Sequence, residues 1–87
     1  MSNKEKQKLP KWFDGEVYEA GSEVINPLSG DSCLLNAEEL SMYDVIKGAE
    51  IAMTMGFTDM NLCNKIIKRG VDWFIANNPS AYYILLN

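Results

Sequence analysis

Side chains that commonly carry out catalysis or hold metals are sparse in this chain. The chain has no histidine, the side chain that most often serves as a general base and as a metal ligand in proteins. A Ser–His or Cys–His nucleophile pair therefore cannot form. The acids lack the Asp-x-Asp-x-Asp-Gly spacing of a calcium loop, and the six glycines form neither a Gly-x-Gly-x-x-Gly turn nor a P-loop. We therefore expect no enzyme activity, no metal site, no cofactor and no small-molecule ligand.

The two cysteines are the remaining nucleophile candidates. Cys33 and Cys63 lie far apart in the sequence and lack the spacing of metal ligands, so we expect two free thiols; a single disulfide between them is the alternative. Cys63 falls in the first turns of a predicted helix, where the helix dipole can lower a thiol pKa. Its place on the apolar face of that helix favours a buried, inert thiol instead.

Charge is distributed unevenly along the sequence. The stretch between Trp12 and Ile46 holds eight acidic residues and no lysine or arginine, while the segments before and after it carry net charges of +3 and +1, which together give the chain its net charge of −4. An acidic chain attracts nucleic-acid phosphates poorly. The acidic stretch is either a solvated face or a docking surface for a basic partner.

A length of 87 residues allows one small domain. Residues 1–8 are expected to form a flexible tail and residues 9–87 a single domain, with a hairpin region over 9–36 and a helical region over 37–87. The sequence shows no secretory signal and no apolar run of the ~20 residues that span a bilayer, so we expect a cytoplasmic protein without membrane contact. Because a core this small gains from a partner surface, we expect a homo-oligomer, most simply a dimer.

Three short strands are predicted in the hairpin region, over residues 16–19, 23–26 and 31–35. Between the last two strands, Pro27 fixes φ and Gly30 permits positive φ, which is typical of a hairpin turn. The alternation of side chains places four apolar residues on the side of the hairpin that faces the helices. They are Val17, Val24, Cys33 and Leu35.

The first helix is predicted to begin at Ala37, because Asn36 and Glu39 have the spacing of a capping box, and to end at Gly56. Its apolar face comprises Met42, Val45, Ile46, Ala49, Ala52 and Met53. Gly48 lies inside this helix at a cost of about 1 kcal/mol relative to alanine. It indicates either a close approach by another element or simple tolerance.

A second helix, capped by Thr58 or Asp59, is predicted to run to the Asn-Asn-Pro tripeptide, where Pro79 disfavours a helical residue before it. Asn78 then caps a short last helix that begins at Pro79 and ends at Leu86. The buried stripe of the second helix comprises Cys63, Ile66, Ile67, Gly70, Trp73 and Phe74. Together the patterns predict an α+β fold: a small N-terminal β-hairpin or meander packed on two antiparallel helices and a short C-terminal helix.

Aromatic and methionine side chains are the candidates for contact with another protein. The candidate interface residues are Trp12, Phe13, Tyr43, Trp73 and Tyr83. Trp73 and the adjacent Phe74 also continue the apolar stripe, which favours a place in the core. Four methionines form either an adaptable binding surface or gap-fillers in the core; they are Met42, Met53, Met55 and Met60.

Five stretches of the chain resemble one group of proteins. They are Leu9-Pro10-Lys11-Trp12-Phe13-Asp14-Gly15-Glu16-Val17-Tyr18, Asn26-Pro27-Leu28-Ser29-Gly30, Glu39-Leu40-Ser41-Met42-Tyr43-Asp44, Gly70-Val71-Asp72-Trp73-Phe74 and Asn77-Asn78-Pro79-Ser80-Ala81-Tyr82. From Leu9 onward the chain resembles a family of small uncharacterised proteins of contractile-tailed marine phages, chiefly those that infect cyanobacteria. That family has no assigned activity, so the resemblance implies a phage-encoded protein in a bacterial cytoplasm and no functional residue.

The sequence therefore predicts a non-enzymatic protein that self-associates or binds another protein. The alternative is a nucleic-acid-binding accessory protein that uses a small group of cations on the second helix together with the lysine-bearing N-terminal tail. Those cations are Lys65, Lys68 and Arg69.

Overall fold

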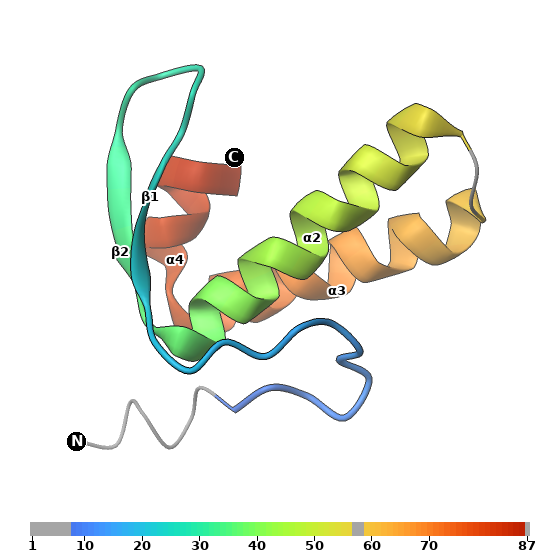
Figure 1. Cartoon of the computed structure of the whole chain (residues 1–87), viewed down its shortest axis with the longest axis horizontal. Coiled ribbons are helices and arrows are strands. Elements are labelled where there is room, and N and C mark those ends of the chain that lie inside the picture. The colour runs from blue at the N-terminus through green and yellow to red at the C-terminus, as the bar shows by residue number, and fades with distance from the viewer. Residues whose placement is uncertain (1–7, 57–58, 87) are drawn as a thin grey trace.

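The computed structural model describes residues 8–56 and 59–86, and the predicted flexible tail falls almost entirely outside these ranges. It has a β-hairpin, two long antiparallel helices and a short helical C-terminus, which confirms the predicted α+β fold (Figure 1). The elements are β1 (Ser22–Ile25), β2 (Ser32–Leu35), α2 (Ala37–Met55), α3 (Met60–Asn77), α4 (Pro79–Ala81) and the π-helix η1 (Tyr82–Leu86).

The hairpin forms where the sequence predicts it. β1 and β2 pair antiparallel, with Val24 opposite Cys33. In the turn, Gly30 adopts the positive φ of 83° that its type permits, and its N–H donates to the Asn26 carbonyl across 2.8 Å. Val24 and Cys33 lie half-buried against the core and Leu35 is fully buried, so three of the four predicted inward side chains do face the helices.

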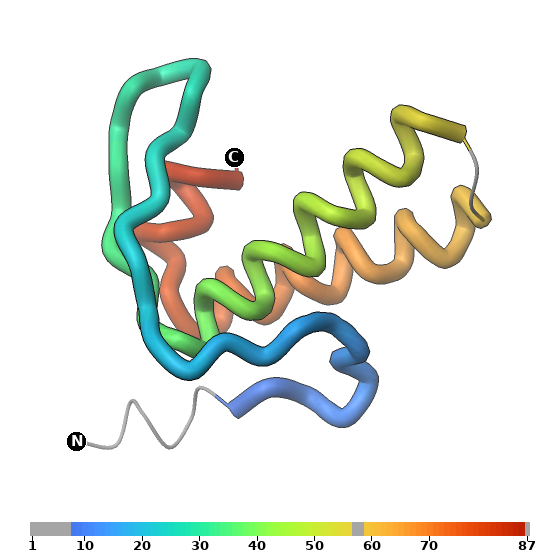
Figure 2. The backbone as a smooth tube through the Cα atoms, viewed as in Figure 1, coloured from blue at the N-terminus to red at the C-terminus, as the bar shows by residue number. Residues whose placement is uncertain are grey.

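The predicted strand over residues 16–19 is wrong. This segment has no strand and runs along the helix pair on the side away from the hairpin turn (Figure 2). The backbone N–H of Tyr18 donates to Oγ of Ser41 across 2.9 Å, so a helix side chain takes the place of a partner strand. Val17, predicted to face the core, is 64% exposed because its segment packs beside α2 and not on the sheet.

The caps of α2 were predictable from local sequence. The Asn36 side chain accepts from the Glu39 N–H across 2.8 Å, and the Asn36 N–H donates to Glu39 Oε1 across 2.9 Å, which confirms the capping box. Gly56 ends the helix in the left-handed region at φ 75°. A side chain at Gly48 would point into open space, so this glycine is tolerated and does not accommodate a close neighbour.

The second half of the chain also follows its predicted boundaries. Asp59 caps α3, and its side chain accepts from the N–H groups of the first turn; Thr58, the other predicted cap, lies outside the described residues. Asn78 caps α4, with Pro79 at its first position. The predicted last helix divides in two, because after Ala81 the chain changes from α-helical to π-helical bonding.

The core lies where the hairpin, the start of α2 and the end of α3 meet. Its buried members are Leu35, Met42, Ile46, Trp73, Phe74, Ala81 and Leu85. α2 and α3 approach closely at Gly70, where a Cβ would lie 2.6 Å from Cδ1 of Ile46. The core thus occupies one end of the helix pair, and the other end projects beyond it (Figure 1).

Candidate functional site

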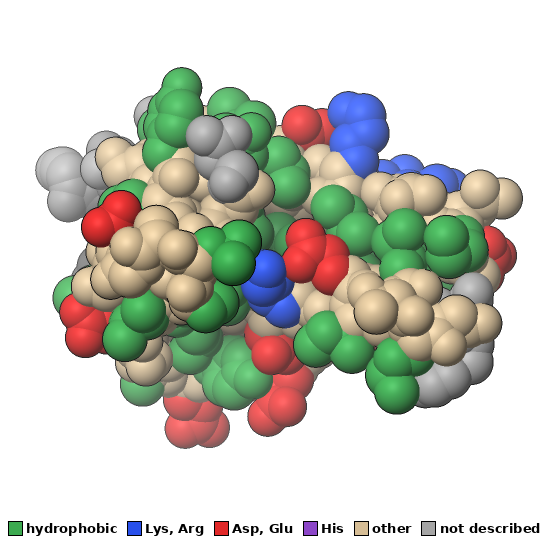
Figure 3. Space-filling view, turned by 90° about the horizontal axis from the view of Figure 1, so that it is seen from above, with side chains coloured by type: hydrophobic (Ala, Val, Ile, Leu, Met, Phe, Trp, Pro, Cys, Tyr) green, Lys and Arg blue, Asp and Glu red, His purple; other side chains and the backbone are tan. Residues whose placement is uncertain are grey.

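The projecting part of the helix pair, residues 47–56 and 59–69, is called the arm. Of its described residues Ala49 and Cys63 are buried, and all the others are half-buried or exposed. Four large apolar side chains of the arm are at least half exposed: Ile51, Met55, Met60 and Leu62. Seen from above, hydrophobic side chains gather over this part of the molecule (Figure 3). Two helices alone therefore leave much of the arm's apolar surface in water.

A hollow of about 310 Å³ lies on α2 in the arm, and we call it the α2 groove. Its lining residues are Lys47, Glu50, Ile51, Thr54 and Met55. They recur at the three- and four-residue spacing of one helix face, next to the stripe that packs on α3. Ile51 and Met55 are 59% and 60% exposed. The surface of the groove is therefore largely apolar and accessible to a partner.

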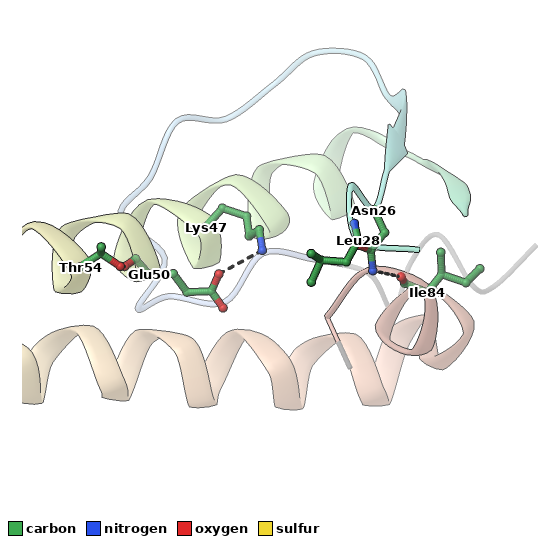
Figure 4. A network of polar contacts seen from close by, with 6 residues as sticks. All are labelled: Asn26, Leu28, Lys47, Glu50, Thr54 and Ile84. Atoms are coloured by element: carbon green, nitrogen blue, oxygen red, sulfur yellow. Dashed lines mark hydrogen bonds and ion pairs between the residues drawn. The ribbon is translucent and has the colours of Figure 1, made fainter. Parts of the chain in front are cut away.

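The hairpin turn stands beside the α2 groove. Leu28 at the turn is 96% exposed, and its side chain points toward the Lys47 end of the groove (Figure 4). The turn is held in place because Asn26 Nδ2 donates to the Ile84 carbonyl across 2.9 Å, while Asn26 Oδ1 accepts from the Leu28 N–H across 2.8 Å. An exposed leucine is thus presented on a turn that the C-terminal helix fixes.

The charged groups of the groove are engaged with each other. Lys47 Nζ lies 3.0 Å from Glu50 Oε1 and 5.8 Å from the centre of the Tyr43 ring. Thr54 Oγ1 donates to the Glu50 carbonyl across 3.0 Å. Because one cation and one anion pair inside the groove, its net charge is zero, and what it offers a partner is chiefly apolar area.

The pKa values of the Cys33 thiol and the Tyr18 hydroxyl are both raised, which disfavours the deprotonated, nucleophilic form of each group. Partial burial raises the pKa of the Cys33 thiol, and the negative charge of Glu39 raises it further, so the thiolate is disfavoured at neutral pH. Burial also raises the pKa of Tyr18, with added contributions from the carboxylates of Asp44 and Glu16. Cys63 is buried and both thiols are free, which confirms the predicted state of the cysteines.

Glu39 is a buried carboxylate whose role is structural. It is 4% exposed, and its oxygens accept from the Asn36 N–H across 2.9 Å and from Asn78 Nδ2 across 3.0 Å. These bonds join the start of α2 to the end of α3. Among the described residues, no three acids, cysteines or histidines come together in a way that could hold a metal ion.

The predicted interface aromatics lie in different parts of the molecule. Trp73 is 9% exposed, packs edge-on against Phe74 and donates from Nε1 to the Lys8 carbonyl across 3.1 Å, as a core residue does. Trp12 and Phe13 are half-buried against the core. Tyr43 is likewise half-buried against the core and lies beside Lys47, whereas Tyr83 is 70% exposed.

The methionines divide between the core and the surface. Met42 is fully buried and Met53 half-buried, whereas Met55 and Met60 are exposed at the tip of the arm. Sequence reasoning missed Ile51 as a surface residue, although it lies outside the apolar stripe predicted for the first helix. That off-stripe position is the signal that identifies it.

The cations of the alternative hypothesis lie on the outer side of α3. Lys65, Lys68 and Arg69 are all exposed. Lys68 Nζ lies 3.1 Å from Asp72 Oδ2, an i,i+4 pair that cancels part of the local positive charge. The resulting surface is only weakly basic.

Comparison of the chain with protein-family models, with curated proteins and with solved structures finds no match. Within the described residues, no helix combines the length and the apolar character that crossing a membrane requires. What can be said of function therefore rests on the surface features above.

Proposed function

We propose that this protein acts by binding another protein chain through the α2 groove and the neighbouring hairpin turn, and that it is not an enzyme. The observation that carries the proposal is the large exposure of Ile51 and Met55, which line one hollow, and of Leu28, whose side chain points toward the Lys47 end of that hollow. Fully burying a leucine, isoleucine or methionine side chain contributes about 1.5–3 kcal/mol, so a partner that covers these three gains substantial free energy. The fixed turn lowers the ordering cost of that contact.

The paired charge in the groove supports a protein partner and not a nucleic acid. A partner that covers Lys47 and Glu50 meets an ion pair with a net charge of zero, whereas phosphate binding needs cations with unused charge. The exposed cations Lys65 and Arg69 favour the nucleic-acid alternative, but seven of the eight acids between Trp12 and Ile46 are exposed elsewhere on the same small molecule. Their combined field repels phosphate.

The setting of this binding role is proposed from the resemblance to marine phage proteins. A phage-encoded protein made in a bacterial host acts in the host cytoplasm, where its partner is then found. No residue role comes from that resemblance.

A photo-crosslinking side chain placed at Ile51 tests the proposed binding face. We expect one discrete adduct in cells that produce the full chain, and we expect Leu28→Asp on the same chain to abolish it. The matched control carries the crosslinker at Val17, which is exposed to a similar degree but lies on the N-terminal segment. Failure to form an adduct from Ile51, or equal adducts from both positions, would contradict the proposal.

A further inference from the structure

We propose that the chain that occupies the α2 groove is a second copy of this protein, with the two arms packed antiparallel across a two-fold axis. This inference rests on the proposed binding function and adds the identity and the orientation of the partner. It follows from the shape of the arm, from the distribution of charge and from the size of the surface.

The arm is half of a common architecture. Two helices side by side bury one stripe each, and Ile51 and Met55 lie outside the stripe that α2 packs on α3. A second pair of helices laid over the first completes a four-helix bundle and covers the facing sides of both pairs. In a two-fold pairing the same patch serves both copies, so one exposed surface is sufficient.

Charge selects the antiparallel orientation. In the arm the cations outnumber the acids four to two: Lys47, Lys65, Lys68 and Arg69 against Glu50 and Asp59. Most exposed acids of the rest of the domain lie on the N-terminal segment, the hairpin and the first half of α2; the exception, Asp72 on α3, pairs with Lys68. An antiparallel pairing brings each basic arm toward the acidic end of its partner and keeps the two acidic ends apart.

The same orientation matches exposed apolar groups at the two ends of the arm. The tip carries Met55 and Met60, which are 60% and 51% exposed. The other end faces the hairpin turn with Leu28, which is 96% exposed. When the arms run antiparallel, each tip reaches the partner's turn, and flexible methionines are well suited to pack around a fixed leucine.

The size of the surface fits a weak, reversible dimer. The helical parts of the arm, residues 47–55 and 60–69, are each about 15 Å long. A face two helices wide therefore has a footprint of roughly 300 Å², to which the hairpin turn adds, compared with about 800 Å² per partner in a standard stable interface. We accordingly expect a dimer whose population depends on protein concentration.

Sedimentation equilibrium of the purified full chain tests the inference. Between about 1 μM and about 1 mM, the average mass should rise toward twice that of one chain. Ile51→Glu should weaken the dimer at least about tenfold, because it places a charge in the apolar contact. Ile75→Glu is the matched control, since it makes the same change at a 48% exposed position of α3 outside both the arm and the acidic segments, and it should leave the dissociation constant within about twofold.

Three outcomes would overturn the inference. They are a wild-type chain that stays monomeric throughout, a dimer that Ile51→Glu leaves intact, and equal weakening by both variants. Circular dichroism establishes that the variants are folded, and Leu28→Asp, on a different element, replaces Ile51→Glu if that variant unfolds.

Salt dependence tests the orientation separately. Added salt screens charge, so it should weaken an arrangement in which basic arms face acidic ends. Tighter association at high salt would instead indicate that acidic ends face each other, and it would overturn the antiparallel arrangement.

The photo-crosslinking experiment distinguishes failure of this inference from failure of the proposed function. If the adduct at Ile51 has the mass of two copies, both stand. If the adduct contains a different protein and the purified chain stays monomeric, the second-copy inference fails and the binding face remains. If no adduct forms, the binding face itself is wrong.

Discussion

The side-chain amide of Asn78 donates a hydrogen bond to Oε2 of Glu39 across 3.0 Å, and this bond ties the first turn of α2 to the junction of α3 and α4. Each partner also takes part in capping a helix start. Glu39 accepts from the Asn36 N–H at the start of α2, and Asn78 Oδ1 accepts from the Ala81 N–H at the start of α4. Two helix starts thus depend on these two side chains, one of which is a buried carboxylate.

Replacement of this asparagine should be costly. Asn78→Ala removes the cap of α4 and leaves a buried carboxylate oxygen of Glu39 without its amide donor, so we expect a loss of about 2 kcal/mol in the free energy of unfolding. Urea denaturation measures the change. Asn64→Ala is the control, because Asn64 is exposed on the same helix pair, and its change should be near zero. Equal losses for both variants would contradict a role for the Glu39 contact.

Two glycines in the helix pair should respond in opposite directions to the same substitution. Gly70→Ala places a methyl group against Ile46 where α2 and α3 pack closely, and we expect destabilisation by about 1–3 kcal/mol. Gly48→Ala adds a methyl group in open space and should stabilise the protein by about 0.5–1 kcal/mol. Thermal and urea unfolding of the two variants provide the comparison.

A second substitution tests the cause of the Gly70 effect. Ile46→Val removes Cδ1, one of the atoms that the new methyl group would meet. In the double variant, Gly70→Ala should therefore cost less than it does alone. Strict additivity of the two changes would show that the contact with Cδ1 of Ile46 is not the source of the loss, whereas Cγ1, which valine retains, would still meet the methyl group.

The parts of the fold that were predictable from sequence depend on neighbours in the chain. The capping box joins residues three apart, and Gly56 ends its helix through its own backbone conformation. Residues 16–19 could not be assigned in this way. Their alternation resembles a strand, but Tyr18 bonds to Ser41, 23 residues later, and nothing in the local sequence identifies that partner.

The candidate site was partly predictable for the same reason. Ile51 lies off the apolar stripe of its helix, so the helical spacing by itself marks this side chain as a surface residue. The placement of Leu28 depends instead on the bond from Asn26 to the Ile84 carbonyl, 58 residues away. For Trp73 the sequence pattern fits both a core and an interface position, and its burial places it in the core.

The buried position of Trp73 leads to a stability prediction. Trp73→Ala should cost about 3–5 kcal/mol, because it opens a cavity beside Phe74 and removes the bond to the Lys8 carbonyl. Trp73→Phe keeps most of the volume and should cost less. Denaturation followed by the fluorescence of Trp12 measures both. A Trp73→Ala variant that stays fully stable but fails to bind a partner would instead place Trp73 in an interface.

Stability should fall at alkaline pH through Tyr18. The pKa of Tyr18 is raised above its ordinary value of 10.0 in the folded protein, by burial first and then by the carboxylates of Asp44 and Glu16. Above pH 10 the unfolded chain therefore loses this proton before the folded chain does, so rising pH favours unfolding. The stabilising contribution is fully present below pH 10 and is lost as the pH rises through the folded pKa.

Urea denaturation at a series of pH values should show a shallower alkaline decline for Tyr18→Phe than for the wild type. Asp44→Asn, which removes one of the two neighbouring charges, should lower the pKa of Tyr18 toward its ordinary value in an ultraviolet titration. An unchanged decline in Tyr18→Phe would assign the alkaline sensitivity to other groups.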